Sequence, residues 1–425
     1  MSIRKGIQDI ILWRGLNFLS VLVLNVLLAR VFEAAGAGSV FFIINNLSLL
    51  ILVLSFSLEA GLGYYAATGK IENVQAGLLA LVWCLVMSSI SFCIFSFYNL
   101  SLPIGLNLKF PAVFFIAGNL LISFYSALYF AKENFFLPNF LLLIINLLLI
   151  VLFIPPLNER ITQRELLYAY FAGFLVQGIL ITVFYFSKSN RGTYKFPVIA
   201  DLKLVMKYSG AAFLGNIIFF LVYRIDYWFV ETWCSAADLG NYIQVSKIVQ
   251  WFLVIPSMIG TVIFPLTAIG KNTMMVEKVA LSSRMLLGLF SIICLGLSIT
   301  GFWIFPFIFG DTYSAMYPVF LLYIPGILAL VSLYPVSSYH AGINRLDINI
   351  KGCLLALLVI ITGNWLFTPS YGIYAASIAS SVGYIVYFIY SLHNFNKRNK
   401  IKLSRFFKPL SGDYTFLKTM LYKRK

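Results

Sequence analysis

Residues 208–233 read YSGAAFLGNIIFFLVYRIDYWFVETW, a stretch long and apolar enough to cross a lipid bilayer. Arg224 and Asp226 nevertheless lie inside it. Because burying a charge at membrane depth costs on the order of several kcal/mol, charges that are kept there generally serve a purpose. Arg14 interrupts the first apolar segment, and Lys247 interrupts the segment after Asp226. These four residues predict a polar chamber inside a bundle of helices.

The composition of the chain is that of an integral membrane protein. Of its 425 residues, 61% are hydrophobic and 11% are charged, and the mean hydropathy is +0.91. Ordinary soluble domains carry about 25% charged residues. A spanning helix needs about 20 apolar residues, and the chain holds about twelve such runs. We therefore expect an all-α integral membrane protein with about 12 transmembrane helices.

The predicted spans are residues 10–32, 38–58, 75–98, 110–131, 135–155, 166–187, 208–232, 240–268, 281–309, 317–340, 348–367 and 370–394. The first run has a basic start followed by apolar residues, as a signal peptide does. No small-residue cleavage site follows it, so we expect a retained helix.

Basic residues are distributed unequally over the two sides of the predicted membrane. The formal net charge is +16, from 31 basic and 15 acidic residues. With an even number of spans, most lysines and arginines fall on the side of both termini, including the run from Lys188 to Lys207. By the positive-inside rule, both termini are expected to be cytoplasmic. The excess charge thus indicates topology and contact with anionic membrane lipid, and not binding of nucleic acid.

Cysteine and histidine give no sign of a metal centre. The cysteines lie in or at the ends of apolar runs without paired spacing, which favours packing. His340 and His393 stand alone near helix ends, so neither a metal site nor a histidine-based catalytic dyad is expected. No cofactor is predicted, and the sequence leaves a coupling ion, H⁺ or Na⁺, open. The five cysteines are Cys84, Cys93, Cys234, Cys294 and Cys353.

The longest polar connection divides the spans six and six. We expect an N-terminal six-helix lobe at 1–187, a cytoplasmic linker at 188–207 and a C-terminal six-helix lobe at 208–394, followed by a basic cytoplasmic tail at 395–425. The end of the linker, Ile199–Tyr208, mixes apolar and basic residues. This pattern suits a helix lying at the membrane interface, and a solvated basic loop is the alternative.

A weak internal sequence similarity supports two parallel repeats. EAAGAGSVF at Glu33–Phe41 is similar to SAADLGNYI at Ser235–Ile243, and each joins the first and second helices of its half. A pair of six-helix lobes related by such a repeat is a recurrent transporter plan, with the substrate between the lobes.

A polar stripe marks the first predicted helix. Arg14, Asn17, Val21 and Asn25 recur at steps of three and four residues, so they share a face about 80° wide. We interpret the stripe as one wall of the chamber. The alternative is that Arg14 reaches the lipid headgroups from near the cytoplasmic end of its helix.

The seventh predicted helix carries a second polar face. Asn216, Tyr223, Arg224 and Tyr227 fall within about 100° of one another, whereas Asp226 points to a different side. The two charges of this helix are therefore not expected to neutralise each other.

Lys247 is the candidate partner of Asp226. At about 1.5 Å per residue, both lie about 9 Å from the outer ends of their antiparallel helices. We expect a cavity ion pair between them, which leaves Arg224 available. A guanidinium stays charged and donates two parallel hydrogen bonds, so it suits phosphate, although a structural ion pair or a carbonyl-capping role is the alternative.

The chain resembles the polysaccharide and O-antigen (Wzx-type) flippases of the multidrug/oligosaccharidyl-lipid/polysaccharide exporter superfamily, which have a MATE-like fold. The resemblance runs nearly end to end. The segment GINR at 342–345 departs from the family pattern, so the motifs identify the family without naming a sugar. Four segments carry the resemblance: LLARVFEAAGAGSVFFI (27–43), SLEAGLGYYAA (57–67), YRIDYWFVETWCSAADLGNYIQVSKI (223–248) and TPSYGIYAASIASSVGYIVYF (368–388).

The resemblance implies translocation of a polyprenyl-diphosphate-linked oligosaccharide, an O-antigen or capsule repeat unit, across the bacterial cytoplasmic (inner) membrane. It implies alternating access without bond chemistry, so no enzyme, with other polysaccharide assembly proteins as partners. A sugar diphosphate needs a hydrated, cationic cavity in place of lost water, while its prenyl tail can stay in lipid. The expected substrate-binding residues are Arg14, Asn17, Asn25, Asn216, Tyr223, Arg224 and Tyr227.

Two other functions compete with this one. A cation-coupled multidrug antiporter of the same superfamily would carry intramembrane carboxylates, whereas only Asp226 stands here against three buried cations. A membrane polysaccharide polymerase, ligase or glycosyltransferase needs an acid, a base or a metal ligand on a sizeable aqueous loop. The predicted outer loops are short and contain no histidine.

Overall fold

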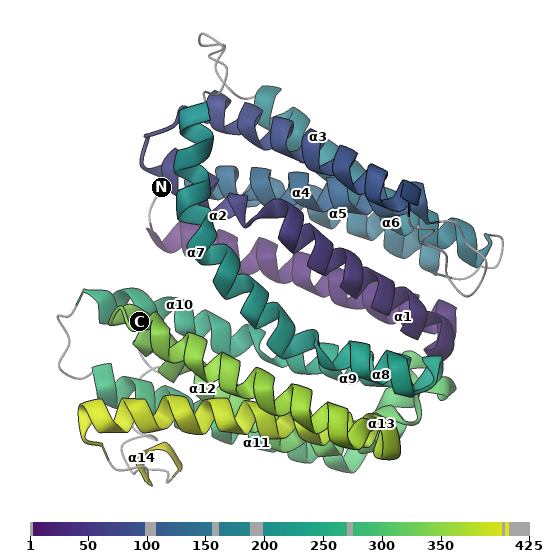
Figure 1. The fold of residues 1–425 in the computed structure, drawn as a ribbon, viewed down its shortest axis with the longest axis vertical. Coiled ribbons are helices and arrows are strands. Elements are labelled where there is room, and N and C mark those ends of the chain that lie inside the picture. The colour runs from purple at the N-terminus through teal and green to yellow at the C-terminus, as the bar shows by residue number, and fades with distance from the viewer. Residues whose placement is uncertain are drawn as a thin grey trace. The chain divides into compact units, whose positions relative to one another are not determined.

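The structure, a computed structural model, describes residues 3–97, 108–154, 161–187, 199–269, 275–401 and 404–407. All regular elements in these ranges are helices, as expected for an all-α protein (Figure 1). The chain forms two compact units, residues 1–217 and 218–425.

The helices of the first unit are α1 (Ile3–Ser55), α2 (Leu58–Ala67), α3 (Asn73–Phe97), α4 (Lys109–Ala131), α5 (Phe136–Phe153), α6 (Gln163–Ser187) and most of α7 (Ile199–Arg224). The elements of the second unit after α7 are α8 (Asp226–Trp233), α9 (Ala236–Phe252), α10 (Val254–Ala268), α11 (Met275–Phe309), a 3₁₀ turn (Asp311–Tyr313), α12 (Met316–Gly342), α13 (Leu346–Asn399) and α14 (Ser404–Phe407).

The predicted twelve spanning helices are confirmed. The described residues contain ten helical stretches that are long and apolar enough to cross a membrane. Two of them, α1 and α13, each consist of two arms, because the backbone leaves the helical conformation at Glu33 (φ 55°) and at Gly372 (φ 58°). Figure 1 shows both arms of α1 in purple, and the arms of α13 in light green and yellow. The loops expected at 33–37 and 368–369 are therefore reduced to one residue each.

The two similar segments, Glu33–Phe41 and Ser235–Ile243, both begin where consecutive helices join. Glu33 forms the bend of α1, and Ser235 is the N-cap residue of α9. The Ser235 hydroxyl accepts a hydrogen bond from the Asp238 amide at 3.1 Å, and the Asp238 carboxylate accepts one from the Ser235 amide at 3.3 Å. This reciprocal capping box satisfies two amides that the first turn of a helix leaves unpaired.

The second predicted span is followed directly by a further helix. We expected it to end at residue 58, but after a break at Phe56 and Ser57, both with positive φ, the chain continues as α2 to Ala67. The Ser57 amide donates a hydrogen bond to the Ser55 hydroxyl at 3.1 Å, which stabilises the break. Glu59, one residue beyond the predicted end of the span, therefore lies in a helix.

The segment Ile199–Tyr208 is helical and not a loop. It forms the start of α7, which runs without interruption to Arg224. Val205 is fully buried, and its carbonyl oxygen would lie only 2.7 Å from a Cβ added to Gly61 of α2. The predicted linker thus ends as a packed helix, while its residues 188–198 lie outside the described part of the chain.

The outward surfaces of the helices are apolar. Ile292 and Leu295 on α11 are 72% and 63% exposed. Water-soluble proteins rarely expose apolar surface in continuous bands, so this pattern is typical of contact with lipid. The interior of the second unit, by contrast, holds buried polar side chains, among them Asp226, Asn241, Gln244, Ser246, Asn364 and Ser380.

Candidate functional site

A fully buried carboxylate lies at the centre of the second unit. Asp226 begins α8 and is 0% exposed. Its Oδ2 accepts hydrogen bonds from the hydroxyl groups of Tyr242 on α9, Tyr323 on α12 (3.2 Å) and Ser380 on α13 (2.7 Å). The two tyrosine hydroxyls lie 2.7 Å apart. We call Tyr242, Tyr323 and Ser380 the hydroxyl cluster.

The hydroxyl cluster takes the place that we had expected for Lys247. Among the described residues, the contacts of Asp226 do not include an ion pair with Lys247, which is half-buried on α9. Three hydroxyl donors can stabilise a buried carboxylate without burying a second charge beside it, which avoids the cost of dehydrating an ammonium. Depth along a helix indicated two neighbouring residues, but it did not determine which group the carboxylate faces.

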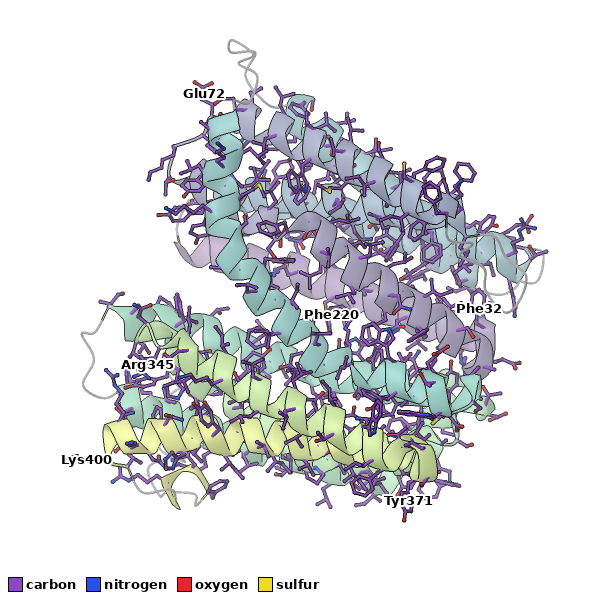
Figure 2. The ribbon with its side chains drawn as sticks, in the orientation of Figure 1. Phe32, Glu72, Phe220, Arg345, Tyr371 and Lys400 are labelled. Atoms are coloured by element: carbon purple, nitrogen blue, oxygen red, sulfur yellow. The ribbon has the colours of Figure 1, made fainter. Side chains whose placement is uncertain are left out.

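Arg224 ends α7 and has partners different from those of Asp226. Its Nη2 donates to the Oε1 of Gln250 on α9 at 3.3 Å. Its guanidinium carbon lies 5.1 Å from the ring centre of Phe220, which is labelled in Figure 2. The side chain is half-buried. The structure therefore brings Arg224 and Asp226 to the same helix joint, but it directs them to separate groups.

The tyrosines near Arg224 are packed inside the second unit. Tyr227 is 2% exposed, and its hydroxyl donates to Ser246 at 2.8 Å and accepts from Gln250 at 3.5 Å. Tyr223 is half-buried, with its ring 5.9 Å from that of Tyr384. In this conformation Tyr227 supports Gln250, the partner of Arg224, and does not present its ring at a surface.

Asn216 lies on α7 but belongs to the first unit. Its side chain is exposed and donates a hydrogen bond to the Ser57 hydroxyl at 3.0 Å. The predicted polar face of the seventh helix is thus divided: Asn216 is joined to the break before α2, while Tyr223, Arg224 and Tyr227 lie in the second unit.

Arg14 is exposed on the first arm of α1. Its guanidinium carbon lies 5.9 Å from the ring centre of Phe130. Within the described part of the chain, no carboxylate lies within salt-bridge distance of Arg14. Asn25, further along the same arm, is half-buried.

Asn17, one turn after Arg14, is joined to a cluster of buried polar side chains. Asn146 on α5 donates from Nδ2 to the Oδ1 of Asn17 at 3.1 Å and to the Ser20 hydroxyl at 3.0 Å. Gln177 on α6 donates to the Oδ1 of Asn146 at 2.8 Å. We call Asn17, Ser20, Asn146 and Gln177 the amide cluster. The sequence pattern identified only Asn17, because Ser20 is not part of the stripe on α1, and Asn146 and Gln177 lie on helices for which no polar stripe was predicted.

Glu59 is the acidic residue that sequence reasoning missed. It is half-buried on α2, and its Oε2 is buried without a hydrogen-bond partner in the described residues. The signal was present in SLEAGLGYYAA, but ending the second span at residue 58 placed Glu59 outside the membrane. The first unit therefore contains a half-buried carboxylate in addition to the charges that the sequence singled out.

The cysteines are all free thiols, and Cys84, Cys294 and Cys353 are buried, as packing predicts. Burial, reinforced by the Asp238 carboxylate, raises the pKa of the Cys234 thiol between α8 and α9 to about 11, so this thiol stays protonated at neutral pH. In the described ranges, no three His, Cys, Asp or Glu side chains are grouped closely enough to hold a metal ion.

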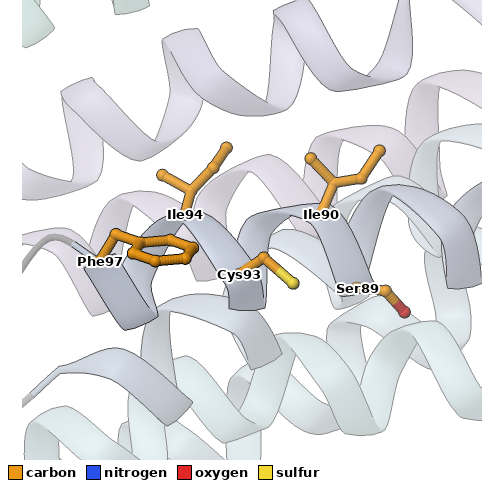
Figure 3. A pocket seen from close by; sticks show the side chains of 5 residues that line it. All are labelled: Ser89, Ile90, Cys93, Ile94 and Phe97. Carbon is orange, nitrogen blue, oxygen red and sulfur yellow. The ribbon is translucent and has the colours of Figure 1, made fainter.

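Two hollows lie on the outer surfaces of the helices. Figure 3 shows the first, which is lined by α3 alone. Its residues are Ser89, Ile90, Cys93, Ile94 and Phe97. The second, of about 570 Å³, is an apolar groove between the two arms of α13 and includes Leu366, Tyr371 and Ile378. Neither contains a residue of the predicted site.

Comparison with known proteins supports the fold. The family model described as "Polysaccharide biosynthesis protein" matches residues 164–318. The structure of "Lipid II flippase MurJ, inward closed conformation" aligns with a TM-score of 0.69 and 14% identity, covering 97% of this chain and 96% of that chain. The chain has the fold of the multidrug/oligosaccharidyl-lipid/polysaccharide exporter superfamily.

Two further solved structures extend the likeness within this superfamily. An inward-facing multidrug resistance MATE family transporter aligns with a TM-score of 0.66 and 14% identity over 90% of this chain and 94% of that one. The bent form of the Vibrio cholerae MATE transporter VcmN aligns with a TM-score of 0.62 and 14% identity, covering 95% of this chain and 98% of that chain. No match is found among curated protein sequences. The fold that the sequence resemblance implied is confirmed, and the similar structures are named as transporters or flippases.

Proposed function

We propose that this chain moves a polyprenyl-diphosphate-linked oligosaccharide, an O-antigen or capsule repeat unit, from the cytoplasmic to the outer leaflet of the bacterial inner membrane. Translocation proceeds by alternating access, with both termini cytoplasmic and without bond chemistry. Support comes from the polysaccharide biosynthesis match over 164–318 and from likeness to a structure named as a lipid II flippase.

The observation that carries the proposal is the environment of Arg14. It is an exposed arginine on a helix that is otherwise apolar enough to span a membrane, and no described carboxylate lies within salt-bridge distance of it. Asn17 follows one helical turn later on the same face. A guanidinium and an amide in this arrangement suit a phosphate, because both donate hydrogen bonds and the charge persists at any biological pH.

Arg224 of the second unit is the other group that we propose for phosphate binding. It is half-buried, and its Nη2 donates to the neutral amide of Gln250. A guanidinium stays charged at any biological pH and has five N–H donors, so it can bind a phosphate oxygen while it keeps such a contact. Tyr227 and Gln250 act as its support in this scheme.

Replacement of Arg14 or Arg224 by Ala is the direct test. In a host that depends on this chain for surface glycan, each variant is expected to insert normally, to abolish glycan display and to accumulate lipid-linked oligosaccharide on the cytoplasmic side. Replacement by Lys is expected to restore display only in part, because an ammonium cannot donate two parallel hydrogen bonds in one plane. Display is measured by glycan staining, and insertion by membrane fractionation.

Arg164→Ala provides the matched control. Arg164 is an exposed arginine at the start of α6 that contacts the ring of Tyr168, and its loss should leave glycan display unchanged. Normal display in both Arg14→Ala and Arg224→Ala would remove the phosphate-binding role of these residues.

A cation-coupled multidrug antiporter is the second candidate, and the carboxylates favour it. Asp226 is fully buried, and Glu59 is half-buried with one oxygen unpaired among the described residues. Such groups are the usual sites of cation or proton exchange inside membrane proteins. Expression in a drug-sensitive host separates the two functions: export of organic cations that is lost in Asp226→Asn, together with unaffected surface glycan, would establish the antiporter.

A further inference from the structure

The amide cluster of the first unit has a fixed hydrogen-bond direction. In a primary amide the oxygen only accepts and the nitrogen only donates. The orientation of one amide therefore determines the orientation of the next amide to which it is bonded. In this cluster two backbone carbonyl oxygens, which can only accept, set the direction from both ends.

The first fixed point is the carbonyl oxygen of Leu142. Gln177 donates to it from Nε2 at 3.4 Å, and the same nitrogen donates to the Oδ1 of Asn146 at 2.8 Å. Reversing the Gln177 amide would place its oxygen against the Leu142 oxygen and against the oxygen of Asn146. The Oδ1 of Asn146 is thus held toward Gln177, and its Nδ2 is held toward α1.

The second fixed point is the carbonyl oxygen of Asn17. The Ser20 hydroxyl donates its one hydrogen to this oxygen at 2.7 Å. The Ser20 oxygen can then only accept from Asn146, which again requires Nδ2 on that side at 3.0 Å. Ser20, Asn146 and Gln177 are only 5%, 5% and 2% exposed, so water does not offer these groups an alternative partner.

The consequence falls on the side chain of Asn17. Because Asn146 presents Nδ2, Asn17 must face it with Oδ1, at 3.1 Å. The Nδ2 of Asn17, with its two hydrogens, then points away from the cluster and has no hydrogen-bond partner in the described residues. It lies on the half-buried side chain of Asn17, one turn from the exposed guanidinium of Arg14.

We propose that Asn146 is a positioning residue that makes Asn17 a hydrogen-bond donor to the anionic headgroup of the transported lipid. The role of Gln177 is to lock Asn146 in the orientation that this requires. This inference rests on the proposed function. It states which atom of the Asn17 amide faces the ligand: Nδ2 can donate to phosphate oxygens, whereas Oδ1 would repel them.

The experiment measures binding of farnesyl diphosphate, with farnesol as the uncharged comparison, to purified full-length protein in nanodiscs. Asn17→Ala is expected to weaken diphosphate binding about tenfold to hundredfold, the range for one hydrogen bond to a charged group. Asn146→Asp accepts from Gln177 but cannot donate to Asn17, so the Asn17 amide reverses. A similar loss is expected for this variant, and Asn146→Leu serves as the second variant if the aspartate prevents folding.

A double-mutant cycle separates positioning from simple stability. In the Asn17→Ala background, Asn146→Leu should still lower the melting temperature but should not weaken diphosphate binding further. Ser48→Ala is the control, because the Ser48 hydroxyl of α1 donates to the Ile44 carbonyl oxygen of its own helix at 2.6 Å and is not a member of the amide cluster. Its affinity for the diphosphate should stay within about twofold of the wild type.

The possible results separate failure of the proposed function from failure of the positioning role of Asn146. Wild-type protein that binds farnesyl diphosphate no better than farnesol overturns the proposed function and the donor role of Asn17 with it. Wild-type preference for the diphosphate, combined with unchanged affinity in folded Asn146→Leu and Asn146→Asp, overturns the positioning role alone. Equal and additive losses at positions 17 and 146 also overturn it, because they show two independent effects.

Discussion

The crossing of α4 and α6 gives a sharp prediction about stability. A Cβ added to Gly118 would lie 2.3 Å from the carbonyl carbon and 2.4 Å from the carbonyl oxygen of Phe174, and 2.5 Å from the amide nitrogen of Leu175. All three are backbone atoms, so no side-chain rotation can relieve the clash. Gly178 on α6 faces Gly118 in the same way, with its own added Cβ only 2.8 Å from the Gly118 oxygen. The two helices are in direct backbone contact, as small residues allow in membrane bundles.

Gly118→Ala therefore forces α4 and α6 apart by about 1 Å, since non-bonded carbon atoms prefer separations near 3.5–4.0 Å. Overpacking of this kind costs about 1–3 kcal/mol, occasionally more, and the better helix propensity of Ala returns at most about 1 kcal/mol. We expect a net loss of about 2 kcal/mol. For a unit of this size, that corresponds to a fall in melting temperature of about 4–8 °C.

Thermal unfolding of the detergent-solubilised protein, followed by size-exclusion of the remaining folded fraction, measures this loss. Gly296→Ala on α11 is the control, because an added Cβ there meets no atom within 4 Å. The control should keep or slightly raise the melting temperature. If Gly118→Ala melts at the same temperature as Gly296→Ala, the two helices are not in backbone contact and the packing described for the first unit is wrong.

Two further predictions concern the second unit. Asp226→Leu removes the acceptor of the hydroxyl cluster and should lower the free energy of unfolding by at least about 2 kcal/mol. Asp226→Asn keeps an acceptor and should lower it less. Denaturant titration of both variants measures the two losses, and equal losses would contradict the prediction. Ser235→Ala removes the capping box of α9 and should destabilise the start of this helix by about 1 kcal/mol. The loss should appear as faster hydrogen exchange at the Asp238 amide. Unchanged exchange there would show that the cap does not stabilise the helix.

Much of the fold follows from local properties of the chain. Hydropathy predicted all twelve spanning helices, because the apolar length needed to cross a bilayer is a property of one contiguous segment. The errors lie at the joints. At Glu33 and Gly372 a single residue replaces an expected loop, and at Phe56 and Ser57 a helix resumes where an end was expected. Such turns depend on one backbone conformation, which a hydropathy window averages away.

The site was predictable only in part. Arg14, Asn17, Arg224 and Asp226 were singled out because charged and amide groups are conspicuous within apolar helices, and their role in binding stays a prediction. The hydrogen-bond partners of Asp226 and Asn17 could not be predicted, because Ser380 lies 154 positions from Asp226, and Asn146 lies 129 positions from Asn17. Serine and tyrosine are too common in membrane helices for sequence alone to single out Tyr242, Tyr323 or Ser380.

The sequence by itself determined that this protein spans the membrane as twelve helices, and which of those helices carry charge, since each of these facts belongs to a short continuous segment. Only the tertiary structure decided that Asp226 is held by hydroxyls instead of by Lys247, and that the Asn17 amide presents its nitrogen. The reason is physical: the rotation and crossing of neighbouring helices choose hydrogen-bond partners, and those are set by packing across the whole unit.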